Sequence, residues 1–207
     1  MQPPLFCTAY LPPIAYMALL SRYQQVLIEQ CESFPKQTYR NRCVILTGNG
    51  LMTLSVHVVH TQGNHTLTSD MGITYAENWN IKHLRAIRAA YNASPYFLYY
   101  QDELESILMH PYDRLIDLNH ALLLFLLNKM KIKTQVEYTT DFISPKEVDG
   151  DDYRYTITPK QPCPITISPY DQVFADRFPF FPNLSSLDLL FNLGPDSKRY
   201  LDSIAIQ

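Results

Sequence analysis

The chain has 207 residues, of which 46% are hydrophobic and 18% are charged, so it can build a sizeable core and is not a wholly disordered chain. Its length predicts one domain that spans residues 1–207. Its 17 basic and 20 acidic residues leave a net charge of −3, which argues against nucleic acid or an anionic membrane surface as a general partner.

The hydrophobic pattern predicts an α/β protein. Short apolar runs between turn residues predict strands, and apolar residues three or four positions apart predict helices. In chain order, the predicted elements are a strand 5–9, a helix from Ile14, strands 25–29, 42–47 and 52–59, helices 80–93, 95 to about 110 and 114–129, a strand 134–138, a helix 183–192 and a closing segment 196–204.

The opening of the chain gives the strongest fold signal. Pro12 and Pro13 suit the first turn of a helix between strands 5–9 and 25–29, and such a β-α-β unit places its strands in parallel. The turn Gly48-Asn49-Gly50 predicts an antiparallel pair that we expect to join the same sheet. The predicted fold is α/β: a single domain with a mixed, partly parallel sheet opened by a β-α-β unit and packed by helices.

Residues 141–169 form the longest segment without a regular pattern. They contain five prolines and an acidic run, which predicts an irregular and exposed stretch. Two alternatives stay open, a mobile lid over a site or a long loop.

Several classes of function lack support in the sequence. The longest strongly apolar run, 121–127, is too short to cross a bilayer, and residues 1–9 show no secretory signal, so we expect a cytoplasmic protein without membrane insertion. The cysteines are widely separated, and His57 and His60 project from opposite faces of a strand, so we expect no metal and no cofactor. Motifs of the common hydrolases, kinases and dehydrogenases are absent.

A basic segment at 36–42 is the first candidate site. Lys36, Arg40 and Arg42, with Asn41 beside them, follow the opening β-α-β unit on its carboxyl side, where open α/β sheets bind ligands. Two guanidinium groups and one ammonium group suit a phosphate or a carboxylate. The alternative is a solvated surface loop.

His83 is the candidate general acid or base. It lies at the border of the apolar stripe in the predicted helix 80–93, next to Lys82, whose charge would favour the neutral imidazole. The alternative is a structural histidine.

Two further polar residues lie within apolar helical stripes. Asn119 is at the centre of the stripe of helix 114–129, so it either braces another backbone segment or reaches into a polar pocket. Asp188, in helix 183–192, would seek one of the basic residues named above if it is half-buried, or would serve as an ordinary helix cap.

The order of five motifs resembles the WbqC-like family of bacterial proteins. The matching stretches are 9–16, 36–42, 83–97, 117–119 and 182–194. Many members carry His-Gln-Pro-Asn where this chain has Phe6-Cys7-Thr8-Ala9, so an activity that uses this histidine would need Cys7 or Thr8 as the nearest replacement.

The resemblance implies an enzyme of bacterial surface polysaccharide (O-antigen type) biosynthesis, and we expect acyl or aminoacyl transfer to a nucleotide-linked amino sugar. The diphosphate, or another anionic small molecule, would lie against the basic segment while His83 assists proton transfer. The candidate substrate-binding residues are Lys36, Arg40, Asn41, Arg42, Tyr91, Asn119 and Asp188, and the candidate catalytic residue is His83. The main alternative is a non-catalytic binding or accessory protein that meets a protein partner through an aromatic surface. A third hypothesis, a nucleotide site at the first helix as in nucleotidyltransferases, rests on fold analogy alone.

Overall fold

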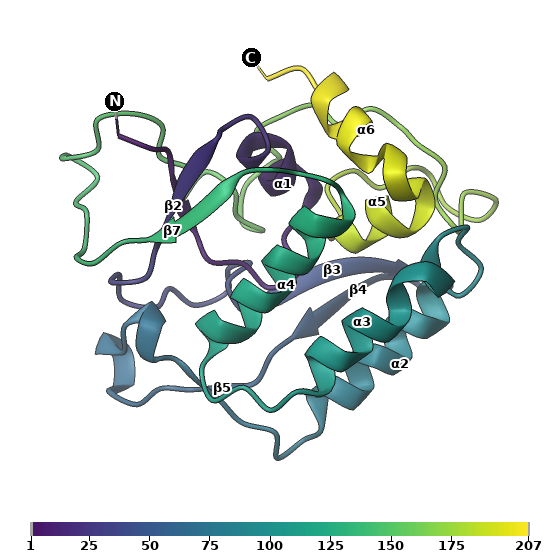
Figure 1. Cartoon of the computed structure of the whole chain (residues 1–207). Helices are drawn as coiled ribbons and strands as arrows, with labels where there is room; N and C mark the ends of the chain where they lie inside the picture. Colours follow the sequence, from purple (N-terminus) through teal and green to yellow (C-terminus); the bar gives the residue numbers. More distant parts are fainter. Residues whose placement is uncertain (1, 207) are drawn as a thin grey trace.

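The computed structural model describes residues 2–206, apart from the side chain of Asn64 (Figure 1). The strands are β1 (Leu5–Cys7), β2 (Gln25–Glu29), β3 (Arg42–Thr47), β4 (Gly50–Ser55), β5 (Val58–Val59), β6 (Gly72–Ile73) and β7 (Gln135–Tyr138). The α-helices are α1 (Ile14–Leu20), α2 (Trp79–Tyr91), α3 (Phe97–Met109), α4 (Leu115–Lys129), α5 (Ser186–Leu193) and α6 (Ser197–Ser203), and short 3-10 turns cover Gly63–His65, Thr68–Asp70 and Gly194–Asp196. The predicted α/β class is confirmed.

A parallel sheet has the strand order β1-β2-β7. β1 and β2, which α1 joins, pair in parallel with Leu5 opposite Leu27, so the predicted β-α-β unit is confirmed. On the outer edge of β1, Leu5 exchanges backbone hydrogen bonds with Asp151 and Tyr153, at 2.9 and 2.8 Å. Residues 151–153 therefore continue the sheet as a short parallel segment.

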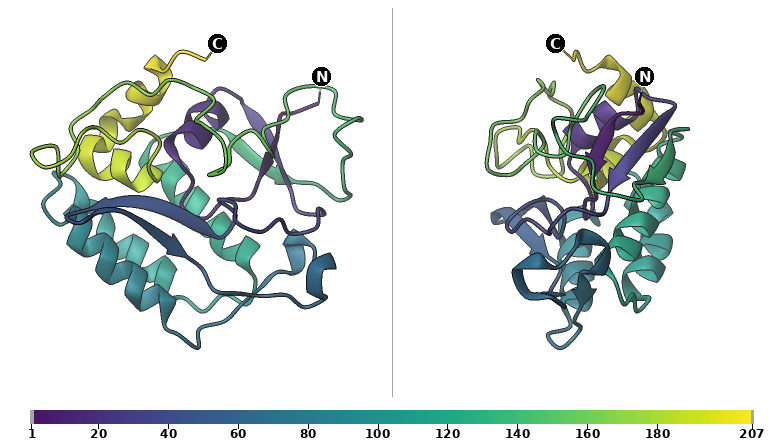
Figure 2. Two further views of the ribbon diagram at one scale, coloured as in Figure 1. Left: turned by 180° about the vertical axis from the view of Figure 1, so that it is seen from behind. Right: turned by 90° about the vertical axis from the view of Figure 1, so that its left-hand side faces the viewer.

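The β3-β4 hairpin forms at the predicted turn 48–50, with Gly48 and Asn49 as its loop and Gly50 as the first residue of β4, but the prediction that it joins the parallel sheet is wrong. The outer edge of β1 is already occupied by residues 151–153. The hairpin instead lies along α2, as Figures 1 and 2 both show, and the outer edge of β3 receives a hydrogen bond from the Ser185 backbone N–H to the Val44 carbonyl (2.8 Å). The predicted strand 52–59 divides into β4 and the separate strand β5, which pairs with β6.

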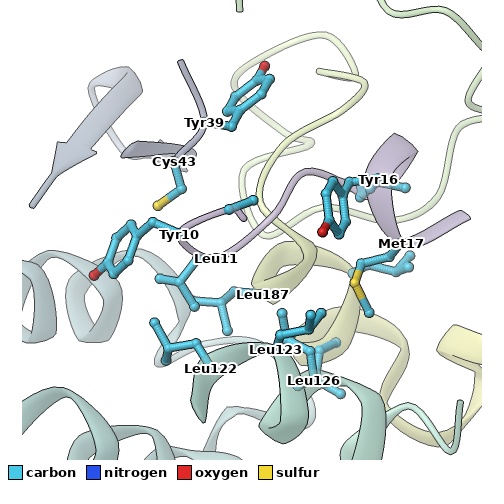
Figure 3. Close-up of a cluster of buried hydrophobic side chains, with 14 of the residues drawn as sticks. Tyr10, Leu11, Tyr16, Met17, Tyr39, Cys43, Leu122, Leu123, Leu126 and Leu187 are labelled. Atoms are coloured by element: carbon cyan, nitrogen blue, oxygen red, sulfur yellow. The ribbon is translucent and has the colours of Figure 1, made fainter. Parts of the chain in front are cut away.

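The helices enclose an apolar core that the chain enters directly after β1. α4 contacts α3 and α5, and α1 contacts α5 and α6. In Figure 3, Tyr10 lies below Cys43 of the hairpin, and Leu11 points toward Leu187 of α5 and Leu122 of α4. Each of these five side chains is at most 1% exposed. The segment that leaves β1 is therefore fixed to the hairpin and to two helices at once.

The stretch between β7 and α5 contains no helix or strand in the described chain, as its proline content predicts. It leaves β7 as the green loop on the left of Figure 1 and returns to pair with β1 through residues 151–153. Arg154, directly after this pairing, is only 1% exposed, so part of the irregular segment is packed into the fold. None of the helices within residues 2–206 is long and apolar enough to cross a membrane.

Gly194, at the end of α5, tests how tightly the helices pack. Its φ is +51°, and a Cβ built at this position would lie 2.5 Å from the ring of Tyr96. We expect Gly194→Ala to lower the free energy of unfolding by about 2–4 kcal/mol, because backbone strain and a steric clash add. Gly63 has a φ of +58° but nothing within 4 Å of its Cβ, so Gly63→Ala should cost about 1–2 kcal/mol. Urea unfolding measures the free energy of unfolding of both variants. Equal losses would mean that the Tyr96 ring moves aside without a cost in stability.

Candidate functional site

Segments that follow parallel strands meet at one edge of the sheet. Glu32 lies three residues beyond β2, Phe142 four residues beyond β7 and Tyr155 two residues beyond the 151–153 pairing. Because parallel strands end at the same edge, these side chains converge, and they line a cavity of about 420 Å³. The other lining residues are Cys31, Ser33 and Pro35. The sheet also changes its direction of growth here, from β2 and β7 on one side of β1 to 151–153 on the other, and open α/β sheets bind ligands at such a point.

The buried carboxylate of Glu29 joins the segments around this cavity. Its side chain is 0% exposed. One oxygen accepts hydrogen bonds from the Cys31 backbone N–H and the Thr139 hydroxyl, both at 2.8 Å. The other accepts from the Arg154 guanidinium and the Ile143 backbone N–H, both at 3.1 Å. Glu29 therefore fixes the chain that follows β2, the chain that follows β7 and the residue after the 151–153 pairing.

The guanidinium of Arg154 supports the two aromatic rings that line the cavity. It donates to both oxygens of Asp152, from Nε at 2.9 Å and from a terminal nitrogen at 2.7 Å. Its central carbon lies 5.8 Å from the ring centre of Phe142 and 5.3 Å from that of Tyr155, in cation–π contact. Although both rings are about half exposed, they are held in place by a buried charge.

A second buried ion pair, Glu32–Arg40, reaches the cavity directly. The two side chains are 4% and 2% exposed, and Nε and a terminal nitrogen of Arg40 lie 2.7 and 2.5 Å from Oε1 of Glu32. The Tyr155 hydroxyl donates to Oε2 of Glu32 at 3.2 Å. Because Arg40 bonds to Oε1, Oε2 is the oxygen of Glu32 with acceptor capacity left for a molecule bound in the cavity that Glu32 and Tyr155 line.

Three carboxylates and two guanidinium groups make up this carboxyl-edge cluster: Glu29, Glu32, Asp152, Arg40 and Arg154. Burial raises the pKa of Glu32, and the Arg40 charge and the hydrogen bonds oppose that rise. Burial also acts to raise the pKa of Asp152, but its hydrogen bonds with Arg154 hold that pKa below the usual value. With all five groups ionised the cluster carries one net negative charge, so it favours a neutral or cationic group over a phosphate. A carboxylate with a raised pKa beside a cavity is also suited to accept a proton.

Two of the predicted substrate-binding residues, Arg40 and Asn119, belong to this cluster or touch it. The Asn119 side-chain amide donates to the Arg40 carbonyl (2.8 Å) and to the Thr8 hydroxyl (3.1 Å), so the bracing alternative for Asn119 is confirmed. Arg40 is not part of a solvated loop, because it is buried against Glu32. Asn119 thus positions Arg40, and Arg40 in turn holds Glu32.

The other members of the basic segment lie nearby. Lys36 is exposed, and its carbonyl accepts a hydrogen bond from the Lys160 ammonium group at 3.2 Å. The Asn41 amide donates to the Val56 carbonyl at 3.1 Å. Arg42 begins β3 with its Nε buried and without a hydrogen-bond partner. An anion-binding role for these three residues stays a prediction.

The structure does not bring His83 together with the basic segment. His83 lines a different cavity, of about 430 Å³ between β4 and α2, and none of Lys36, Arg40 and Arg42 lines it. The expected convergence of these four side chains in one cavity is therefore not observed.

The imidazole of His83 is held by hydrogen bonds of its own. Its Nδ1 lies 2.8 Å from the Tyr10 hydroxyl, and the ring also bonds to the backbone of Ser55. The pKa of His83 is lowered to about 4, mainly by burial and also by the nearby His57, while the bond to the Ser55 backbone opposes the shift. The expected neutral form is thus favoured, but mainly by burial. This geometry favours the structural alternative, and a catalytic role for His83 stays a prediction.

Asp188 does not form the expected ion pair with one of the basic residues named in the sequence analysis. Asp188 is 1% exposed and accepts hydrogen bonds from the Tyr170 hydroxyl and from the Gln172 amide, the latter at 3.2 Å. The Tyr91 hydroxyl, which is fully buried, lies beside the same carboxylate. These contacts attach the irregular segment around 170–172 to α5, so their observed role is structural.

Sequence patterns did not identify Glu32, Arg154 or Tyr155. Each lies outside the helices and strands, where hydrophobic periodicity carries no information. Two weak signals were present: an acidic residue just beyond the predicted strand 25–29, and an arginine two residues after Asp152 within an acidic run. The site becomes recognisable only when the structure shows that Glu32 pairs with Arg40 and that Arg154 pairs with Asp152.

A larger cavity, of about 540 Å³, lies at the opposite edge, where β2 and β7 begin. Four cations line it: Arg22, Lys131, Lys133 and Lys198. Arg22 donates to three backbone carbonyls at the end of α6, where a cation is favoured, and Lys198 forms an ion pair with Asp202 one turn along the same helix, so two of these cations already have partners. No carboxylate or histidine lines this cavity, and the carboxyl-edge cavity is therefore the better candidate for acid–base chemistry. Within residues 2–206 no group of three or more His, Cys, Asp or Glu side chains could hold a metal ion.

The buried ion pair makes a prediction about stability. Arg40→Ala should lower the free energy of unfolding by about 3–5 kcal/mol, because it leaves the Glu32 carboxylate buried without its cation. The double variant Glu32→Leu with Arg40→Met should recover most of that loss. Arg114→Ala, which breaks an exposed pair with Asp117, should cost less than about 1 kcal/mol. Chemical denaturation measures all three, and an Arg40→Ala loss as small as that of Arg114→Ala would contradict the buried pair.

The lowered pKa of His83 makes a prediction about pH. Between an ordinary value of 6.5 and about 4, the unfolded chain binds a proton at this position that the folded chain does not bind. Stability should therefore fall as the pH decreases through this window, by on the order of 3 kcal/mol. In His83→Gln this contribution should vanish, and it is measured as the difference between the two pH profiles of unfolding. Parallel profiles would show that His83 titrates normally in the folded protein.

Comparison with known proteins supports the resemblance that the motifs indicate. A family model described as the WbqC-like protein family matches residues 8–159, which include Glu32, Arg40 and Tyr155 of the site. No curated protein and no solved structure matches the chain. Because the family match covers well over half of the chain, the chain belongs to the WbqC-like protein family.

Proposed function

We propose that the protein is an enzyme of bacterial surface polysaccharide (O-antigen type) biosynthesis that binds a nucleotide-linked amino sugar in the carboxyl-edge cavity. Family membership supports the biological setting. The observation that carries the chemical part is Oε2 of Glu32, a buried carboxylate oxygen presented to a cavity between two aromatic rings.

The lining of the cavity suits a sugar ring. Phe142 and Tyr155 are 49% and 46% exposed, so each offers a ring face on which the apolar face of a sugar can pack. Ser33 and the Tyr155 hydroxyl can bond to sugar hydroxyl groups. A volume of about 420 Å³ lies within the usual range for small-molecule sites.

The charge of the cluster decides which end of the substrate enters. Arg40, which the sequence assigns to the diphosphate, is neutralised by Glu32, so the interior of the cavity fits an amine better than a phosphate. A cation is available outside, because the Lys160 ammonium group lies against the Lys36 carbonyl, next to Pro35 at the rim. The sugar would enter the cavity and the diphosphate would remain at this rim.

Glu32 is then placed for acyl or aminoacyl transfer. The amine nitrogen of the sugar would bond to the carbonyl carbon of an activated acyl donor, such as a thioester, as the bond from that carbon to the leaving group breaks. Glu32 would accept the proton that the nitrogen loses and return it to the leaving group. A carboxylate whose pKa is raised by burial is a better base for this step than an ordinary one.

Binding of UDP-glucosamine tests this proposal by calorimetry. Phe142→Ala should weaken binding about 3- to 10-fold through the loss of stacking. Glu32→Gln should weaken it by about 10- to 100-fold, because a charged hydrogen bond to the amine is lost. For UDP-glucose, which lacks the amine, Glu32→Gln should have a smaller effect.

Two controls complete this experiment. Cys31→Ala changes a neutral residue of the same cavity and should leave the affinity nearly unchanged. Thermal unfolding of each variant separates loss of binding from loss of fold. If UDP alone binds as tightly as UDP-glucosamine, the cavity does not recognise the sugar and the proposal fails.

The alternative, a binding or accessory protein without catalysis, has one specific observation in its favour. Leu98 and Tyr99 at the start of α3 are 66% and 78% exposed, which is unusual for neighbouring large apolar side chains. This function predicts a stable complex with a protein partner that Tyr99→Ala weakens and that Glu32→Gln leaves intact.

A further inference from the structure

The outer edge of β4 is open. β4 pairs with β3, and no strand of the described residues lies on its other side. The outer edge of β3 differs, because the Val44 carbonyl there is bonded to the Ser185 N–H. An open strand edge carries N–H and C=O groups that can pair with another strand.

The register of the hairpin identifies these groups. The two-residue turn Gly48-Asn49 makes Thr47 and Gly50 a hydrogen-bonded pair, and bonded and non-bonded pairs then alternate along the hairpin. The hydrogen bond from the Val56 N–H to the Asn41 carbonyl (2.8 Å) fits this alternation. The residues whose backbone groups point away from β3 are therefore Leu51, Thr53 and Ser55.

This edge lacks the features that protect exposed strands from pairing. Residues 50–56 contain no charged residue and no proline. Leu51 and Met52 are 54% and 40% exposed. Exposed edge strands usually carry lysine, proline or a bulge, which keep other strands away. The sequence of β4 is thus typical of a strand whose edge pairs with another strand rather than staying exposed to solvent.

A groove runs along this edge between β4 and α2. β4 contributes the consecutive residues 52–55 to its cavity of about 430 Å³. α2 contributes side chains three or four residues apart on one helix face, namely Trp79, Lys82, His83 and Ala86. The bond between His83 and the Ser55 backbone occupies one end of the edge, which leaves the groups of Leu51 and Thr53 available. A groove between a strand edge and a helix can bind an extended peptide as an added strand.

The charge of α2 selects the occupant. The residues that line the groove include one cation, Lys82, and no carboxylate, whereas Arg88 of the same helix pairs with Glu105 and lines a different cavity. Glu77 does not line the groove but lies 3.8 Å from Lys82 and is 67% exposed, so a ligand carboxylate can replace it as the partner of Lys82. A second copy of the chain paired through β4 would bring a second Lys82 to the groove without a carboxylate that lines it, which is unfavourable. The charge therefore favours a peptide with acidic side chains.

We propose that the β4 edge and α2 form a binding site for an extended peptide segment of a partner protein, which adds to β4 as a strand and directs acidic side chains toward α2. This site is separate from the carboxyl-edge cavity and does not depend on the proposed function.

The test uses the peptide acetyl-Thr-Glu-Val-Glu-Val-Glu-Thr-amide, which presents glutamates on one face of an extended strand. Trp79 is the single tryptophan of the chain and lines the groove, so its fluorescence reports binding directly. We expect a saturable change with this peptide and none with the same peptide carrying lysine in place of glutamate. Lys82→Glu should weaken binding of the glutamate peptide at least tenfold and should allow the lysine peptide to bind.

Substitutions at Thr53 test the strand pairing itself. Thr53→Pro removes an N–H that points away from β3 and leaves the bonds between β3 and β4 in place, so it should weaken binding at least tenfold. Thr53→Val keeps the N–H and should bind as the unmodified protein does. If Thr53→Pro fails to fold, the comparison of the glutamate and lysine peptides with Lys82→Glu decides whether the proposal holds.

Three results would overturn the proposal. The first is the absence of saturable binding of the glutamate peptide at millimolar concentration, and the second is equal affinity of the Thr53→Pro and Thr53→Val variants. The third is a dimer in light scattering that Thr53→Pro converts to monomer, since a second copy would then be the occupant of the edge.

Discussion

The carboxylate of Glu29 is the constraint on which the arrangement of the site depends. It is completely buried, and a buried carboxylate is tolerated only when its oxygens are fully hydrogen-bonded. Its four donors come from the chain beyond β2, the chain beyond β7 and Arg154. Moving any of these segments would remove at least one hydrogen bond from the buried charge, and moving Arg154 would leave that charge without its cation. The walls of the cavity are therefore fixed relative to the parallel sheet although they contain no regular secondary structure.

The same pairing limits what the cavity can bind. Arg40 and Arg154 would suit a phosphate if they were free, but both are engaged by carboxylates. The cavity thus presents Oε2 of Glu32 and two aromatic rings, a surface for a polar but uncharged or cationic ring. Phe6, where many family members have a histidine, is 0% exposed and packs against Tyr153. The side chain at position 6 is therefore part of the apolar core and does not line the cavity.

Elements with a clear hydrophobic period were predictable from the sequence, and contacts between distant segments were not. The β-α-β unit, the hairpin turn and the helices follow from local patterns, and all are present. The hairpin was assigned to the wrong sheet because its place beside β1 is taken by 151–153, a stretch without such a pattern. Asn119 was recognised as a buried amide that needs partners, which burial alone requires. His83 was predicted to lie at the border of the apolar stripe, but it is buried, and its bond to Tyr10 joins residues 73 positions apart, which no local signal predicts.

The carboxyl-edge cavity and the β4 groove share one stretch of chain, residues 39–42. Tyr10, whose hydroxyl bonds His83 in the groove, is attached through its backbone N–H to the carbonyl at position 39 (2.9 Å). The next residue, Arg40, holds Glu32 at the cavity, and β3 begins two residues later. A strand added to β4 would extend the hairpin that starts from this stretch. Two sites that share a stretch of chain affect each other's binding only where that stretch has two arrangements. The structure shows one arrangement of this stretch, in which Arg40 is buried and paired with Glu32, so residues 39–42 fix the cavity and the groove relative to each other.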